Sequence, residues 1–364
     1  MKRLFVSFLM VVMPLSMSHA IDRENACFKN EVCPEGKVCA AYKVPSKSEL
    51  KKRLRMIQKE YKKPWKVQEW GLHWFSKLNE KIKLKYNGFS IKKSAYKETV
   101  VLKYKDRGLT KKTKFYVYDK KDPKYPKNSG KKKPLLLVIP PIYDISPFDY
   151  WQAYDFAERG YKVAILDLGG MSYVSPLQPT SSINKSTLKT IGDANRVIEY
   201  MIRRAYVDPE KVGVFGFSLG GNIASLVFSV NPKIKVLSTV SSGAKFAELL
   251  TNSNQTVAKI YRKMRKKRES ITTDLAYLKT LKKSLLFDPV YFAHLRNPED
   301  VYMVFSDNDT SVPTKNQKEL ESAFCASEEL GTSRWEKGEH FPVIVKDLFK
   351  RTYINDFFDK NLLH

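Results

Sequence analysis

Short apolar runs alternate with longer amphipathic segments from residue 135 to the C-terminus. The apolar runs predict buried strands of a parallel sheet, because such strands are covered on both faces. We expect them at 135–139, 162–166, 212–217, 236–240 and 301–305. The intervening segments predict helices over 147–159, 186–204, 219–230 and 341–358, with a charged and largely helical stretch at 245–297. Strands that alternate with helices indicate an α/β fold with a doubly wound, mostly parallel sheet.

Upstream of residue 135 the pattern is different. Residues 46–62 have apolar positions at helical spacing, and Ser46 with Glu49 resembles a capping box, so we expect an amphipathic helix there. Residues 99–105 and 113–118 alternate like strands around a turn at Asp106-Arg107-Gly108. The aromatic residues between 65 and 90 are more typical of core packing than of a binding platform.

The first twenty residues have the pattern of a secretory signal peptide. Lys2 and Arg3 precede a mostly apolar segment of 14 residues, fewer than the roughly 20 that span a bilayer, and Ser18-His19-Ala20 ends in a small residue. We therefore expect export to the periplasm or medium, with cleavage after Ala20. An uncleaved anchor is the alternative.

Four cysteines agree with an oxidising compartment: Cys27, Cys33, Cys39 and Cys325. An even number allows two disulfides in three connectivities, and the spacing differs from that of zinc sites. If both bonds form, one joins the N-terminal segment to the region of Cys325.

The charge of the chain is uneven. Its formal net charge is +27, yet residues 43–134 alone hold 30 Lys/Arg and 8 Asp/Glu, while residues 135–364 hold 30 and 26. Of the 30 basic residues in 43–134, 27 are Lys, which suits a solvated surface better than bidentate phosphate recognition. We expect weak attraction to an anionic envelope or membrane surface and no specific nucleic-acid partner. The hydrophobic content of 43% is enough for a sizeable core and excludes a disordered chain.

The segment 211–226 (KVGVFGFSLGGNIASL) contains the pattern G-x-S-x-G at Gly216–Gly220. A buried strand precedes it and an apolar helix follows it, so the pattern places Ser218 on a sharp strand-to-helix turn with its hydroxyl exposed at the sheet edge. Such a serine is a candidate nucleophile once a base activates it. A glycine-rich turn without chemistry is the alternative.

The chain order Ser, acid, His selects the partners of Ser218. Among the five histidines, His340 lies in a turn before the last helix and is the predicted base. The acid is expected in the loop 306–313 after the strand at 301–305. Asp309, in the pattern D-x-x-V-P, is favoured, and Asp307 is the alternative.

An oxyanion hole needs two backbone N–H donors. Leu219, directly after the nucleophile, is the first candidate. The second should follow the strand at 135–139, where Pro140 and Pro141 lack an N–H, so Ile142 is the first choice and Tyr143 the second.

Over residues 135–364 these motifs resemble the α/β-hydrolase superfamily: VIPPI (138–142), LDLGG (166–170), the segment around Ser218, DNDTSVP (307–313) and GEH (338–340). The resemblance implies acyl transfer to Ser218 and hydrolysis through His340, with no cofactor or metal. It also implies that 245–297 is a lid over the acyl pocket. The expected organisation is a signal peptide at 1–20, a Cys-containing basic extension at 21–98, and a hydrolase domain at 99–364 that begins with strands in 99–134.

The sequence thus favours an exported serine hydrolase with an acyl-ester substrate, carboxylesterase-like in its chemistry. Two alternatives stay open: a serine peptidase of the same fold, and a basic envelope-binding protein on an inactive hydrolase scaffold.

Overall fold

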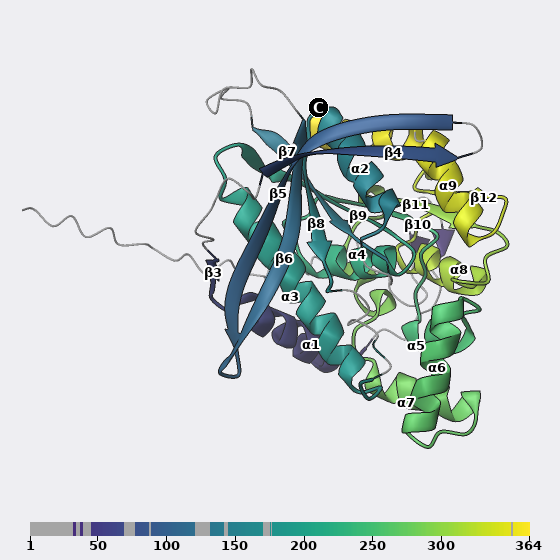
Figure 1. The fold of residues 1–364 in the computed structure, drawn as a ribbon. Coiled ribbons are helices and arrows are strands. Elements are labelled where there is room, and N and C mark those ends of the chain that lie inside the picture. Colours follow the sequence, from purple (N-terminus) through teal and green to yellow (C-terminus); the bar gives the residue numbers. More distant parts are fainter. Residues whose placement is uncertain are drawn as a thin grey trace, which may run out of the picture.

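The computed structural model describes residues 32–33, 37–38, 45–68, 77–86, 89–120, 132–141, 145–169, 175, 177–350 and 352–364 (Figure 1). The expected signal peptide, together with Cys27 and Cys39, lies outside these residues. Among the described residues, no helix is both long and apolar enough to cross a bilayer.

Ten strands of the described chain form one sheet in the order β12-β11-β10-β9-β7-β8-β6-β5-β3, with β4 also paired to β5. Those from β12 to β8 run parallel, and β6, β5, β4 and β3 continue the sheet antiparallel. The strands are β3 (Trp65–Val67), β4 (Lys77–Tyr86), β5 (Phe89–Asp106), β6 (Leu109–Lys120), β7 (Lys133–Ile139), β8 (Lys162–Asp167), β9 (Val207–Phe217), β10 (Val236–Val240), β11 (Val301–Ser306) and β12 (Ser333–Glu336). A separate short pair joins β1 (Val32–Cys33) to β2 (Lys37–Val38).

Helices cover both faces of the sheet (Figure 1). Alternate residues of β7 show why: Leu135 and Leu137 face one core with α3 and α4, while Leu136 and Val138 face a second core with α2. The helices of the first face are α1 (Lys47–Tyr61), α3 (Ser182–Ile202), α4 (Leu219–Val230) and α8 (Thr314–Ala323), and those of the second are α2 (Pro147–Glu158), α9 (His340–Lys350) and α10 (Thr352–Phe358). This arrangement confirms the doubly wound α/β fold.

The strand order reverses direction between β7 and β9. The chain passes from β7 to β8 on one side and then crosses back to β9, β10 and β11 on the other. Loops at such a switch point separate and leave a crevice at the carboxyl ends of the strands. Ser218 directly follows β9, so it lies at the carboxyl end of the sheet next to this switch point.

The basic N-terminal segment joins the sheet and the core. β5 is longer than the expected strand and runs through residue 99, where we expected the hydrolase domain to begin. Arg196 on α3 is fully buried, and its Nη2 lies 2.7 Å from Asp193 Oδ1 and 3.5 Å from Glu60 Oε1 of α1. A Cβ at Gly192 would lie 2.3 Å from the Glu60 side chain, so this glycine lets α1 approach α3 closely.

Some elements differ from the sequence expectation. The last helix divides into α9 and α10, and β12 and α8 were not predicted. β12 has only four residues and α8 is mostly polar, so neither has an apolar run or a wide apolar stripe. The stretch 245–297, which we call the helical insertion, contains α5 (Phe246–Asn252), α6 (Thr256–Arg268) and α7 (Asp274–Ser284). Its role as a lid stays a prediction.

Candidate active site

Ser218 occupies a strained turn between β9 and α4. Its backbone has φ 52° and ψ −128°, a region that non-glycine residues rarely adopt. Its N–H donates to the Val240 carbonyl at 2.9 Å, which holds the turn against the end of β10. Strain of this kind persists only where the surroundings enforce it, and it is typical of a nucleophile elbow.

The glycines of the motif are required by close backbone contacts. A Cβ at Gly216 would lie 2.5 Å from the carbonyl carbon of Gly220, and a Cβ at Gly220 would lie 2.2 Å from the Ile139 carbonyl oxygen. The first contact folds the chain back on itself around Ser218. The second brings the start of α4 against the end of β7, where the expected oxyanion loop begins.

Asp309 is buried in the loop after β11, and both oxygens of its carboxylate form hydrogen bonds. Oδ1 accepts the N–H groups of Ser311 and Val312, both at 2.8 Å. Oδ2 accepts the Gln317 side-chain amide at 2.9 Å and lies 2.6 Å from His340 Nδ1. An ionised carboxylate only accepts hydrogen bonds, so this contact keeps a proton on Nδ1 and leaves Nε2 as an acceptor.

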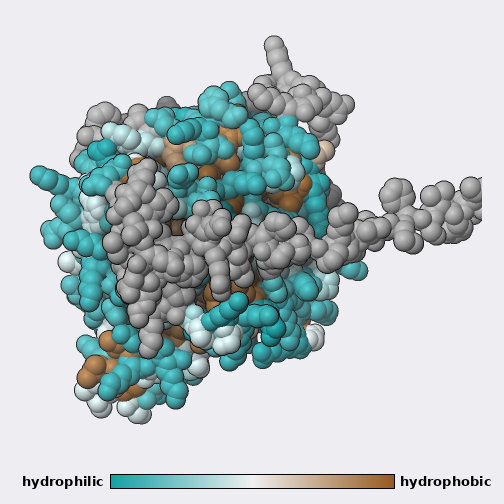
Figure 2. Space-filling view, turned by 180° about the vertical axis from the view of Figure 1, so that it is seen from behind, coloured by the Kyte–Doolittle hydropathy of each residue, from teal (hydrophilic) through white to brown (hydrophobic). Residues whose placement is uncertain are grey.

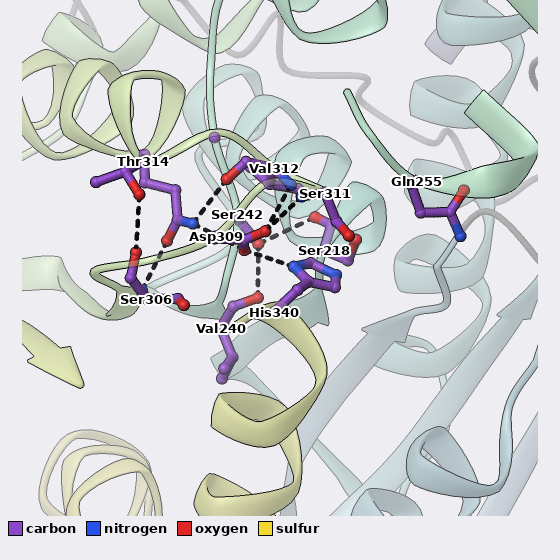
Figure 3. A network of polar contacts seen from close by, with 12 residues as sticks. Ser218, Val240, Ser242, Gln255, Ser306, Asp309, Ser311, Val312, Thr314 and His340 are labelled. Carbon is purple, nitrogen blue, oxygen red and sulfur yellow. Dashed lines mark hydrogen bonds and ion pairs between the residues drawn. The ribbon is translucent and has the colours of Figure 1, made fainter. Parts of the chain in front are cut away.

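His340 begins α9, directly after the turn that follows β12. Two contacts of the β11 end fix this turn: the Gly338 N–H donates to Asp307 Oδ1 at 3.0 Å, and Ser306 Oγ donates to the Gly338 carbonyl at 2.5 Å. In Figure 3 a dashed line marks the hydrogen bond between the His340 ring and Asp309, and the ring is drawn next to Ser218. The structure therefore joins His340 to Asp309, and the catalytic role of Ser218 with these two residues stays a prediction.

Asp307, the alternative acid, lies in a different position. It is exposed, and its carboxylate accepts the Gly338 N–H of the histidine turn. It thus orients the backbone before His340, while the described contacts of the imidazole go to Asp309.

Of the candidate oxyanion donors, Leu219 lies among the described residues. Leu219 is the first residue of α4, where backbone N–H groups have no partner within the helix. Ile142 and Tyr143 lie outside the described residues, so the second donor stays a prediction. The contact between Gly220 and the β7 end nevertheless brings the chain before Ile142 to the start of α4.

Gln317 on α8 is a residue that the sequence did not reveal. It is fully buried, and its amide nitrogen donates to Asp309 Oδ2 at 2.9 Å and to the Val312 carbonyl at 2.8 Å. Its oxygen accepts the Ser306 N–H at 2.9 Å. Gln317 therefore holds both the carboxylate and the end of β11 in place (Figure 3). A polar residue within a short polar helix gives no signal in the sequence.

The helical insertion contacts the loop after β11 that carries Asp309. Ser253 Oγ donates to the Ser311 carbonyl at 2.6 Å, and the Asn254 N–H donates to the Thr310 carbonyl at 2.8 Å. Gln255 then caps α6 with its side chain. The start of α6 is thereby attached to the loop that carries Asp309.

Asp288 holds the start of the helical insertion. Its carboxylate accepts the N–H groups of Lys245 at 3.1 Å, Phe246 at 2.5 Å and Val290 at 3.2 Å. Burial raises the pKa of the Asp288 carboxyl to about 6, although these three donors favour the charged form.

Metal chemistry has no candidate ligand set in the part of the chain that the structure describes, where no three His, Cys, Asp or Glu residues gather as ligands. Cys325 is disulfide-bonded in the structure. The connectivity among the four cysteines stays a prediction, because Cys27 and Cys39 lie outside the described residues.

Comparison with known proteins supports the fold. A family model described as the alpha/beta hydrolase fold matches residues 134–276. The chain is similar to an acetyl xylan esterase from Paenibacillus sp. R4, with 14% identity, a TM-score of 0.56, and coverage of 96% of this chain and 100% of the esterase. It is also similar to acetyl xylan esterase 1 from Thermoanaerobacterium sp. JW/SL YS485, with 13% identity, a TM-score of 0.53, and coverage of 86% and 94%.

A peptidase is among the similar structures as well. The acylaminoacyl peptidase of Pyrococcus horikoshii matches with 12% identity and a TM-score of 0.48 over 74% of this chain, which spans 48% of that peptidase. A search of curated proteins found no match. The family model, the strand order and the two fold matches show that this chain has the α/β-hydrolase fold.

Proposed function

We propose that this protein is an exported serine hydrolase that cleaves carboxylic esters. The observation that carries the proposal is the juxtaposition at one sheet edge of a strained Ser218 and a His340 whose Nδ1 is held by buried Asp309. A serine hydroxyl needs such a base to become a nucleophile, and the base needs an acid that fixes its tautomer.

The reaction follows from these positions. Ser218 Oγ attacks the ester carbonyl carbon while His340 Nε2 takes its proton, and Asp309 stabilises the imidazolium that forms. The carbonyl oxygen becomes an oxyanion, for which the Leu219 N–H and an N–H after Pro141 are the proposed donors. The tetrahedral intermediate collapses, the alcohol leaves with the proton from His340, and an acyl-Ser218 ester remains. Water, deprotonated by His340, then releases the acid and restores Ser218.

Esters are favoured over peptides because the two fold matches that extend over nearly the full length of both chains are named as esterases. Export is supported by the signal-peptide pattern of residues 1–20 and by four cysteines, of which Cys325 is disulfide-bonded.

The test combines covalent labelling with turnover. The wild type should react with a fluorophosphonate probe and hydrolyse p-nitrophenyl acetate, and Ser218→Ala and His340→Ala should lose both activities. His364→Ala, at the exposed C-terminus, is the matched histidine control and should retain both. A folded wild type that neither reacts with the probe nor hydrolyses esters would refute the proposal. Faster cleavage of aminoacyl p-nitroanilides than of esters would assign it to peptidases instead.

A further inference from the structure

The outward face of α6 has apolar side chains in contact with solvent. Ile260 and Met264 are one helical turn apart and are 49% and 41% exposed. Tyr261 and Arg265, the next residues along the helix, lie on another face and are buried. The helix is therefore packed on one side, while its other side leaves two large apolar residues uncovered.

Two further exposed leucines belong to segments attached to α6. Leu275 on α7 is 63% exposed, and Leu177, in the loop after β8, is 71% exposed. Lys266 pairs with Asp274 at 2.8 Å, and the Arg268 guanidinium donates to the Leu177 carbonyl, so both segments are joined to the C-terminal half of α6. We call Leu177, Ile260, Met264 and Leu275 the outer patch. Figure 2 shows apolar atoms among hydrophilic ones on the lobe at the lower left.

Positive charge is concentrated around this patch. Residues 256–284 contain ten Lys/Arg and two acidic residues, whereas the rest of 135–364 contains 20 Lys/Arg and 24 acidic residues. The basic run is thus a local feature of α6 and α7 and does not reflect the composition of the hydrolase body. Both acidic residues have partners, since Glu269 accepts the Thr180 N–H and Asp274 pairs with Lys266.

The lysines on the outward face of α6 flank the apolar residues. Lys259, Lys263 and Lys267 are exposed and recur at helical spacing beside Ile260 and Met264. Lys stems extend along apolar surface while the ammonium group stays hydrated. An amphipathic helix with basic residues around a narrow apolar stripe has the composition of segments that lie in a membrane interface.

We infer that the outer patch and its lysines dock on an anionic lipid surface. The apolar side chains would enter the boundary between headgroups and acyl chains, and the lysines would meet the lipid phosphates. A protein partner fits less well, because Lys is depleted in protein–protein interfaces. The start of α6 is attached to the Asp309 loop through Ser253 and Asn254, so the helix that would dock is joined directly to the proposed active site.

Vesicle sedimentation with the full-length mature protein tests this inference. The wild type should bind vesicles that contain about 30% phosphatidylglycerol, bind phosphatidylcholine vesicles at least about tenfold more weakly, and dissociate as salt rises from about 0.05 to about 0.5 M. The double variants I260S/M264S and K263E/K267E should each lower the partition coefficient about tenfold or more. Ser218→Ala should bind as the wild type, which separates this inference from the proposed chemistry.

The matched charge control is K103E/K112E. Lys103 and Lys112 are exposed and directly opposite each other on β5 and β6, so the pair keeps like charges before and after the change. This variant should retain most of the binding, and melting curves should show that all variants fold. Equal binding to neutral vesicles, or an equal loss in K103E/K112E, would overturn the inference. So would self-association of the wild type that I260S/M264S abolishes without any vesicle binding, because the occupant would then be a second copy of the chain.

Discussion

Replacing Asp309 by Asn tests whether the carboxylate sets the tautomer of His340. The Oδ1 position faces two N–H donors, those of Ser311 and Val312, so the carbonyl oxygen of the new amide must occupy it. The amide nitrogen is then forced toward His340 Nδ1 and toward the Gln317 side-chain amide. Because that nitrogen donates, His340 must accept at Nδ1 and carry its proton on Nε2. Such a ring cannot take the proton of Ser218.

The expected loss in kcat/KM is about 10³- to 10⁴-fold, the scale that accompanies the wrong imidazole tautomer in a serine triad. It corresponds to about 4 to 5.5 kcal/mol of transition-state stabilisation. The contact of the introduced amide nitrogen with the Gln317 amide nitrogen adds a stability cost, for which a buried unsatisfied donor sets a scale of about 1–3 kcal/mol.

Initial rates of p-nitrophenyl acetate hydrolysis, with urea unfolding in parallel, measure both effects. Asp307→Asn is the matched control, since Asp307 is exposed and its carboxylate, among the described residues, contacts the Gly338 backbone alone. It should lose less than about tenfold in kcat/KM, the effect of one solvent-accessible hydrogen bond. A larger loss in Asp307→Asn than in Asp309→Asn, or about a tenth of the activity retained in Asp309→Asn, would refute the reasoning.

Three further changes probe the surroundings of the site. Gln317→Leu removes a hydrogen bond to the Asp309 carboxylate and should lower kcat about 10- to 100-fold with little change in KM. A rise in KM as large as the fall in kcat would indicate a general structural effect. Arg196→Met removes the buried cation between Asp193 and Glu60, while Lys189 still pairs with Asp193. It should lower the free energy of unfolding in urea by about 1–3 kcal/mol, and no measurable change would contradict that role. Asp288 binds its proton more tightly in the folded state, because burial raises the pKa of its carboxyl to about 6. The wild type should therefore lose about 2 kcal/mol of stability relative to Asp288→Asn as the pH rises from about 4 to about 7. Parallel stability profiles of the two proteins against pH would contradict this.

The sequence was most informative where strong local patterns and topology agree. The apolar runs predicted β10 at its observed bounds and β8 and β11 to within one residue. The contact between Asp309 and His340 could be predicted because parallel strands end at one edge, so loops that follow successive strands meet there. The chain order could not show how Asp307 and Asp309 divide their roles, since that depends on which carboxylate is turned inward.

Features that arise from tertiary contacts had no sequence signal. Gln317 is one polar residue in a polar helix, and its role exists only because α8 packs behind the end of β11. The attachment of α1 likewise depends on a buried Arg196 on α3, which looks like any helical arginine in the sequence. The first strands were predicted too short because the lysines along β5 interrupt its apolar alternation.

The segment that carries most of the net charge is not the one best suited to contact an anionic lipid surface. Residues 43–134 hold most of the net charge, so electrostatics alone would place any contact with an anionic surface there. Several of these lysines already have partners: Lys63 lies 2.8 Å from Asp106, Lys114 lies 3.1 Å from Asp167, and Lys97 lies over the Tyr116 ring at 4.5 Å. Attraction between exposed charges is also screened by salt, whereas apolar insertion is not. The α6 lysines flank Ile260 and Met264, so that face can combine both forces, and this combination, more than the number of lysines, should decide where the protein meets a lipid surface.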